Sequence, residues 1–186
     1  LAGLFLGLAM LSKYTAIFLP VGVFLFLILT PAHRGWLCRL GPYLAAAIAL
    51  AVFSPTIVWN ARHEWESFAY QGAGRLQSQK SDLKNVAEFA RRQAEVMTPF
   101  VLLWVWGAGI AAQAAWRRRP WPERLLAAVG MPMLVLFTVL TFRQSARGHW
   151  ILPGPATLYV LVGAVVVRGG ALGKWLIQGT AALAIA

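Results

Sequence analysis

Long apolar stretches alternate with short, basic connections along almost the whole chain, and this pattern restricts the available folds more than any other feature. A helix needs about 20 apolar residues, and roughly 17 at least, to cross the hydrocarbon core of a bilayer. Five stretches come close to this length, and two partial ones flank them. The five are residues 14–29, 42–59, 97–115, 125–142 and 151–167; the partial ones are residues 1–11 and 175–186. We therefore predict an all-α fold, a polytopic bundle of transmembrane helices.

The composition excludes the other broad classes of protein. Hydrophobic residues make up 59% of the chain and charged residues 12%, against roughly 25% charged residues in soluble domains. The net charge of +11 would suit a nucleic-acid partner, but the basic residues are scattered between apolar stretches, as in membrane proteins. Cys38 is the only cysteine, which excludes an intramolecular disulfide. We expect residues 1–186 to form a single transmembrane domain, part of a longer protein.

Lys13 interrupts the first apolar region. Residues 1–29 are too long for one straight crossing, and a lysine in mid-membrane is costly. We therefore predict two helices that meet in a very tight turn at Lys13; one long tilted helix, with Lys13 reaching the membrane surface, is the alternative. Upstream, Gly3 and Gly7 have the spacing that allows close helix packing.

The basic connections predict the orientation in the membrane. Each crossing moves the chain to the other side of the membrane, so loops 30–41, 116–124 and 168–174 lie on the same side. Together these loops contain eight Lys or Arg residues and one acidic residue, Glu123. Short cytoplasmic loops carry such an excess of cations, so we expect these three to be cytoplasmic. Residues 60–96 then form an extracytoplasmic loop. Within it, Ser81 and the helical spacing of apolar residues predict an amphipathic interfacial helix at about residues 81–93.

A group of cations falls at the opposite, outer boundary, where the same rule leaves few. Lys13 ends a helix there, and Arg143, Arg147 and His149 lie in a short connection between two spans. Such an excess suits an anionic partner such as a phosphate, which Arg binds in bidentate fashion and Lys as a point charge. Contact of each side chain with lipid headgroups is the alternative reading. Neither paired Cys nor paired His occurs at metal-binding spacing, so no metal site is predicted.

Several sequence elements resemble one known family, in matching order. Residues 7–16 read GLAMLSKYTA, residues 53–60 read FSPTIVWN, and Trp65 is followed at the third position by Phe68. Residues 93–99 begin with Gln and end with Pro, and residues 149–153 read HWILP. Together these elements resemble the bacterial membrane glycosyltransferases of family 39, relatives of protein O-mannosyltransferases and of the aminoarabinose transferase that modifies lipid A.

The resemblance implies a GT-C fold with its active site on the outer face of the bacterial inner membrane. It implies an enzyme that transfers a sugar from a polyprenyl-phosphate donor to an acceptor, without a nucleotide. The family's catalytic aspartate lies in the first outer loop, upstream of the residues present here. Asp82 does not fall in that motif, so we assign no catalytic residue to this chain.

The resemblance also gives the outer polar residues their expected roles. The expected partners are the polyprenyl-phosphate-linked sugar and membrane lipids; no cofactor and no nucleic acid are expected, while dependence on a divalent metal stays open. A transporter or flippase for an anionic lipid, or a non-catalytic membrane subunit, is the alternative function. The predicted phosphate-binding residues are Lys13, Arg143, Arg147 and His149, and the candidate contacts for donor or acceptor in the outer loop are Asn60, Gln71 and Arg75.

Overall fold

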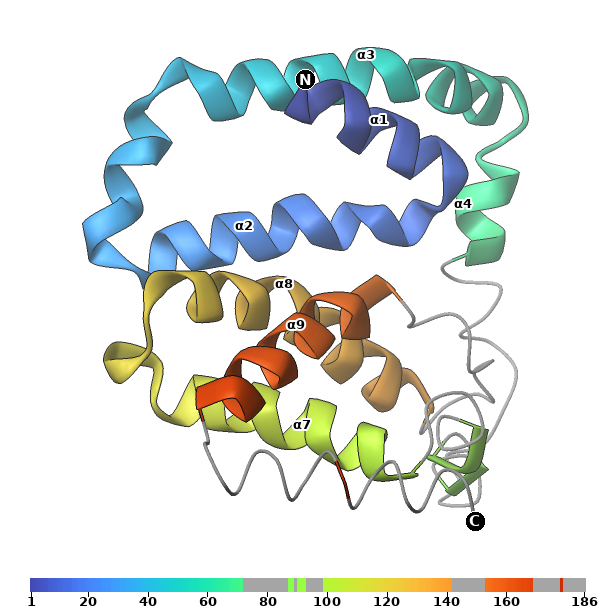
Figure 1. Cartoon of the computed structure of the whole chain (residues 1–186). Coiled ribbons are helices and arrows are strands. Elements are labelled where there is room, and N and C mark those ends of the chain that lie inside the picture. Colours follow the sequence, from blue (N-terminus) through green and yellow to red (C-terminus); the bar gives the residue numbers. More distant parts are fainter. Residues whose placement is uncertain (72–86, 89, 93–98, 142–152, 169–177, 179–186) are drawn as a thin grey trace. The chain divides into compact units, whose positions relative to one another are not determined.

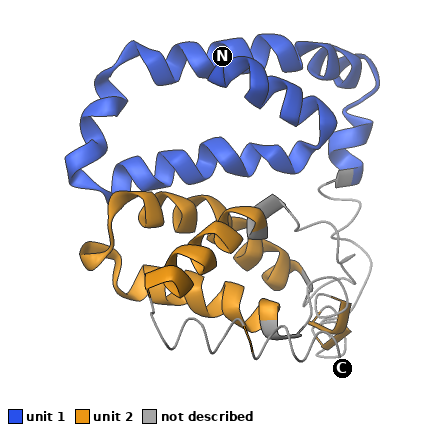
Figure 2. Cartoon of the chain, in the orientation of Figure 1, with its two compact units in different colours: residues 1–80 blue, residues 81–186 orange. Residues whose placement is uncertain are grey.

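The computed structural model describes residues 1–71, 87–88, 90–92, 99–141, 153–168 and 178. Within these residues every regular element is helical (Figure 1), which confirms the all-α prediction. The chain forms two compact units, Leu1–Lys80 and Ser81–Ala186 (Figure 2), and we consider each unit by itself. The single domain over residues 1–186 and the outer loop at residues 60–96 remain predictions.

Unit 1 is built from helices joined by very short connections. The first two apolar stretches form separate helices, and the third continues three residues beyond its predicted end at residue 59. A further short helix follows, within the predicted outer loop. The elements are α1 (Ala2–Ser12), a 3₁₀ turn (Tyr14–Ile17), α2 (Phe18–Leu29), a 3₁₀ helix (Pro31–Cys38), α3 (Leu40–Arg62) and α4 (Glu66–Gln71).

The break at Lys13 is present and abrupt. Lys13 has extended backbone angles, φ −153° and ψ 121°, so the helical hydrogen-bond pattern of α1 stops there. The Lys13 N–H still donates to the carbonyl of Ala9 at 2.8 Å, which completes the last turn of α1. The prediction of two helices with a very tight turn is confirmed, and the single tilted helix is not what forms.

At the other end of α2, where the sequence predicted a loop over residues 30–41, Pro31–Cys38 forms a 3₁₀ helix and α3 already begins at Leu40. Pro31–Cys38 is bent by 120° from the helical segment Tyr14–Leu29. Pro31 starts it, because the proline ring holds φ near the helical value and the missing N–H has no partner to lose. Arg34 Nε donates to the carbonyl of Ile28 at 2.8 Å, which ties the bent segment back to α2.

Helix α1 packs directly against α3 through its two spaced glycines. A Cβ atom added to Gly7 would lie 2.8 Å from the carbonyl oxygen of Ala49 and 2.6 Å from Cβ of Val52. At Gly3 the added atom would overlap the backbone of Ala45. The close packing predicted from this spacing is therefore confirmed.

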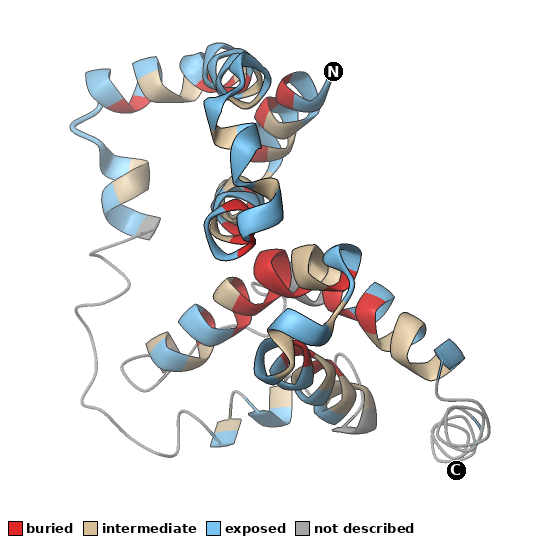
Figure 3. Ribbon diagram, turned by 90° about the vertical axis from the view of Figure 1, so that its left-hand side faces the viewer, coloured by how far each residue is buried: buried red, intermediate tan, exposed pale blue. Residues whose placement is uncertain are grey.

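Unit 2 is organised around one central helix. It comprises α7 (Pro99–Ala114), a 3₁₀ turn (Trp116–Arg118), α8 (Trp121–Thr141) and α9 (Pro153–Arg168). Helix α8 packs against both α7 and α9, which also contact each other. Figure 3 marks many residues along the helices of this unit as buried, whereas the helices of unit 1 keep broad exposed faces. The fully buried apolar side chains of unit 2 include Val105, Met133, Leu134, Leu158 and Leu161.

Each of the five long predicted stretches corresponds to helical structure, but the helices differ in length. Among the described residues, Leu40–Arg62 and Trp121–Leu140 are long and apolar enough to cross a membrane. The bent pair Tyr14–Leu29 with Pro31–Cys38 is a third candidate. The stretch at residues 175–186 lies outside the described residues apart from Gln178. Long apolar helices with exposed apolar faces are those of an integral membrane protein.

An ion-pair cluster around one buried carboxylate joins the start of α8 to the end of α9. Glu123, only 2% exposed, accepts a hydrogen bond from Arg119 at 3.1 Å and another from Arg168. Residues 116–124 and Arg168 therefore lie at the same end of unit 2, as expected when each crossing changes the side of the membrane. Their cytoplasmic placement remains a prediction.

Candidate functional site

The break at Lys13 leads directly into an aromatic cluster. The ring of Tyr14 stacks on Phe68 of α4, with 5.4 Å between ring centroids. It also meets Phe53 of α3 edge to face at 5.9 Å. Such pairs add to the free energy of apolar burial. Tyr14 is thus held from two sides, and the backbone of Lys13 beside it is held in place as well.

A chain of hydrogen bonds continues from Tyr14 across three elements. Ser67 Oγ donates to Oδ1 of Asn60 at 2.7 Å, and Asn60 Nδ2 donates to the carbonyl of Thr56 at 2.9 Å. Because the single proton of Ser67 is used on Asn60, the Tyr14 hydroxyl is the donor in its 3.2 Å contact with Ser67 Oγ. We call Tyr14, Ser67 and Asn60 the polar relay.

The polar relay is buried at its centre. Asn60 is 0% exposed, and a buried amide is costly unless its donors and acceptor are bonded. An apolar core of Met10, Ala16 and Phe53 lies against the ring of Tyr14. The relay therefore has one favourable arrangement, which fixes the ends of α1 and α3 relative to each other.

The turn between α3 and α4 supports this arrangement through its backbone. Glu64 and Trp65 have φ of 51° and 59°, left-handed values that side-chain-bearing residues adopt rarely. The turn is held because the N–H of Trp65 and the N–H of His63 both donate to the carbonyl of Asn60, at 2.8 and 3.1 Å. Asn60 thus organises the turn through its main chain and the relay through its side chain.

His63 faces α3 rather than its acidic neighbours. Its ring stacks on Trp59 at 4.1 Å, and Nδ1 donates to the Trp59 carbonyl at 2.7 Å. Among the described residues, no three His, Cys, Asp or Glu side chains gather as metal ligands would. The absence of a metal or cofactor remains a prediction.

The structure places two of the predicted site residues together. Lys13 lies beside Tyr14 at the break, and Asn60 lies at the other end of the relay. Asn60 was expected to contact donor or acceptor, but its buried and bonded side chain supports the turn. Gln71 is the last residue of α4. Four predicted residues lie outside the described part of the chain: Arg75, Arg143, Arg147 and His149.

Tyr14 and Ser67 were not predicted as site residues. Both stand in elements that carry the family resemblance, residues 7–16 and the Trp65 to Phe68 element. A serine next to Phe68 in this element was a weak signal for a polar contact. Nothing in the sequence indicated that its partner would be Tyr14, 53 positions away.

The predicted interfacial helix at residues 81–93 is described only at residues 87–88 and 90–92, which are helical. Within it, Glu88 accepts hydrogen bonds from Arg91 at 2.8 and 2.9 Å and from Arg92 at 2.8 Å. The bonds from Arg91, and then those from Arg92, lower the pKa of Glu88 to about 2. The carboxylate is therefore ionised at neutral pH and offsets part of the positive charge of this segment.

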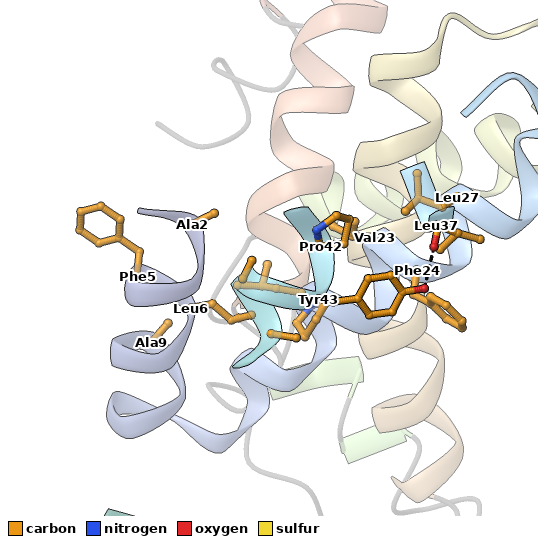
Figure 4. Close-up of a pocket in the computed structure, with 14 residues that line it drawn as sticks. Ala2, Phe5, Leu6, Ala9, Val23, Phe24, Leu27, Leu37, Pro42 and Tyr43 are labelled. Carbon is orange, nitrogen blue, oxygen red and sulfur yellow. Dashed lines mark hydrogen bonds between the residues drawn. The ribbon is translucent and has the colours of Figure 1, made fainter. Parts of the chain in front are cut away.

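Unit 1 also contains an apolar cavity of about 730 Å³ between α1, α2 and the start of α3 (Figure 4). It extends from Ala9 and Leu19, near the break at Lys13, to Leu37 and Tyr43. Its wall is almost entirely apolar, because the Tyr43 hydroxyl is the one polar group among the side chains that line it. This hydroxyl donates to the Leu37 carbonyl at 2.6 Å. Such a surface suits a hydrocarbon chain.

Comparison with known proteins finds similarity to glycosyltransferases. Residues 1–59 match the family described as dolichyl-phosphate-mannose-protein mannosyltransferase. The chain is 28% identical, over 152 residues, to the lipid A galacturonosyltransferase RgtD of Rhizobium johnstonii. That alignment covers 80% of this chain and 31% of the relative. No solved structure matches the chain.

These comparisons confirm the predicted resemblance to membrane glycosyltransferases of the GT-C type. The family match extends from α1 to near the end of α3, and so includes the break at Lys13. The chain spans about a third of the length of the curated relative that it matches.

Proposed function

We propose that the full-length protein transfers a sugar from a polyprenyl-phosphate donor to an acceptor on the outer face of the bacterial inner membrane. The observation that carries this proposal is the position of Lys13. It follows the end of α1, a short apolar helix, within the residues that match the mannosyltransferase family. The catalytic acid or base is expected in a part of the protein that precedes these residues.

The Lys13 end of unit 1 suits the phosphate of such a donor. A lysine ammonium is a compact point charge that stabilises a phosphate, and the phosphate gains negative charge as the glycosidic bond breaks. Thr15, two residues on, has a buried hydroxyl oxygen without a hydrogen-bond partner among the described residues. The polar relay holds this end in one arrangement.

The remaining predicted residues keep proposed roles. We assign Arg143, Arg147 and His149 to the same phosphate, and Gln71 and Arg75 to the donor or acceptor. The apolar cavity of unit 1 is suited to the polyprenyl chain, because one end lies near Lys13 and its wall is apolar. Since the curated relative is named for lipid A, lipid A is the first acceptor to test.

The test is Lys13→Ala in the full-length protein, assayed in membrane vesicles with a polyprenyl-phosphate-linked sugar and lipid A. One hydrogen bond to a charged group contributes about 1.5–3 kcal/mol. At about 1.4 kcal/mol per factor of ten, kcat/KM should fall by roughly 10- to 100-fold. Lys13→Arg should retain more activity than Lys13→Ala, since the positive charge remains.

The matched control is Arg39→Ala. Arg39 is an exposed cation beyond the opposite end of α2, over the ring of Trp36 at 4.8 Å, and its loss should leave kcat/KM nearly unchanged. Equal losses for Lys13→Ala and Arg39→Ala, with both proteins inserted and folded, would show that Lys13 has no special role. If neither the parent protein nor any variant transfers sugar to any acceptor, the glycosyltransferase proposal itself is wrong.

A further inference from the structure

A shallow groove runs between α7 and α9 in unit 2, with a volume of about 340 Å³. Its wall includes Leu103, Trp104 and Gly107 from α7 and Val162 from α9, and Arg119 is its only charged lining residue. A Cβ atom added to Gly107 would meet nothing within 4 Å. The groove is therefore apolar and open along its length, with a guanidinium at one end.

Positive charge accumulates at that end. Arg119 and Arg168 both bond to Glu123, so this one carboxylate already serves two arginines. Arg117 and Arg118 are exposed in the 3₁₀ turn, and neither pairs with a carboxylate in the described part of the chain. The basic end of the groove carries more cations than its single acid neutralises.

Acidic residues are scarce along the sequence around this turn. Five of the six acidic residues precede residue 96, and the sixth is Glu123. Two tryptophans, Trp116 and Trp121, flank the basic turn, and tryptophan is enriched at the headgroup level of membranes. An anion that reaches Arg117 and Arg118 there is best supplied by the lipids of the bilayer.

We propose that the α7–α9 groove binds one anionic phospholipid. An acyl chain lies along Gly107 and Trp104, and the headgroup phosphate contacts Arg117 and Arg118. Basic pockets between membrane helices bind anionic headgroups in this way. The binding site is built from residues of unit 2 alone and does not depend on the proposed sugar transfer.

The test uses the full-length protein in nanodiscs and the fluorescence of Trp104. Phosphatidylglycerol and phosphatidylcholine, each brominated on the acyl chains, serve as quenching probes at equal mole fractions. The fluorescence of Trp104, called the Trp104 signal, is obtained by subtracting the fluorescence of the Trp104→Phe variant from that of the parent protein. We expect phosphatidylglycerol to bind the groove more tightly than phosphatidylcholine does. The double variant Arg117→Gln/Arg118→Gln should weaken the binding of phosphatidylglycerol by about 10- to 30-fold and leave the binding of phosphatidylcholine unchanged.

Two matched controls separate this site from general effects. Arg39→Gln/Arg62→Gln removes two exposed cations of unit 1 and should leave the Trp104 signal unchanged. Gly107→Leu should fill the groove and reduce quenching. Gly163→Leu places the same side chain at another open position, on α9, and should not.

Three outcomes would overturn the proposal. Equal quenching by the two lipids would show that headgroup charge is not recognised. No quenching of Trp104 by either lipid would show that another part of the protein covers the groove. An unchanged preference in Arg117→Gln/Arg118→Gln would show that these arginines do not contact the phosphate.

Discussion

Tyr14, Ser67 and Asn60 belong to three different helical elements, yet one directed chain of hydrogen bonds joins them. The backbone of Lys13 is held at the end of α1 and by its covalent neighbour Tyr14. The position of its charge therefore depends on groups that do not touch the proposed phosphate. The relay is best regarded as a set of positioning residues.

At this scale we predict that Ser67→Ala and Tyr14→Phe each lower kcat/KM of the full-length enzyme by roughly 2- to 10-fold, as expected for one neutral hydrogen bond. The double variant should be no worse than the more harmful single variant, because both changes interrupt the same chain. Ser54→Ala is the control, since Ser54 Oγ makes one local bond to the Ala51 carbonyl. Steady-state kinetics of the single and double variants test this prediction. If the losses of kcat/KM in the two single variants add up in the double variant, the two residues act separately.

Helices α1 and α3 approach each other closely because α1 presents glycine at two positions one turn apart. Membrane helices gain little from hydrophobic association in lipid, so close packing contributes much of their affinity. The carbonyl of Ala49 and the side chain of Val52 occupy the space that a Gly7 side chain would need. The polar relay lies at one end of the same helix pair.

We predict that Gly7→Ala destabilises the protein, because overpacking costs about 1–3 kcal/mol and exceeds the gain in helix propensity of about 1 kcal/mol. Gly41→Ala adds the same methyl group at a position with nothing within 4 Å, so it should be neutral or slightly stabilising. Thermal unfolding of the purified protein in detergent compares the two. An equally stable Gly7→Ala variant would show that α1 and α3 do not pack through this face.

For the whole molecule, the side of the membrane that the Lys13 end faces has the largest consequence for function. Within unit 1 the bent 3₁₀ helix with Arg34 lies at the opposite end of α2 from Lys13. Within unit 2 the arginine-rich turn and Arg168 share one end. The positive-inside rule assigns both basic ends to the cytoplasm.

Cys38 tests this orientation directly, because it is the only cysteine of the sequence and is exposed. A membrane-impermeant thiol reagent should leave it unmodified in intact cells and label it after permeabilisation. In a Cys38→Ala background, Arg62→Cys at the end of α3 should show the reverse pattern. Labelling of Cys38 in intact cells would invert the topology and place Lys13 on the cytoplasmic side.

The sequence by itself determined the helices of this protein and the break at Lys13. Both follow from local free energies, namely the apolar length needed to cross a bilayer and the cost of a charge within it. The glycine spacing in α1 was equally local, and it correctly indicated close packing. Lys13 and Asn60 were also singled out as candidate site residues, because polar groups at helix ends in an apolar chain are few, and the phosphate-binding role of Lys13 stays a prediction.

Only the tertiary structure decided what Asn60 does, which residues join it, and that a groove with a basic end exists. The relay connects residues 53 positions apart, and the bond between Glu123 and Arg168 joins residues 45 apart. The spacing of residues along one helix does not report such contacts, because they depend on which helix faces pack together. Asn60 was predicted to contact the donor or the acceptor, but its side chain is buried and hydrogen-bonded to Ser67 of α4 and to the Thr56 carbonyl. A buried amide must be hydrogen-bonded within the protein, and this requirement makes Asn60 part of the scaffold.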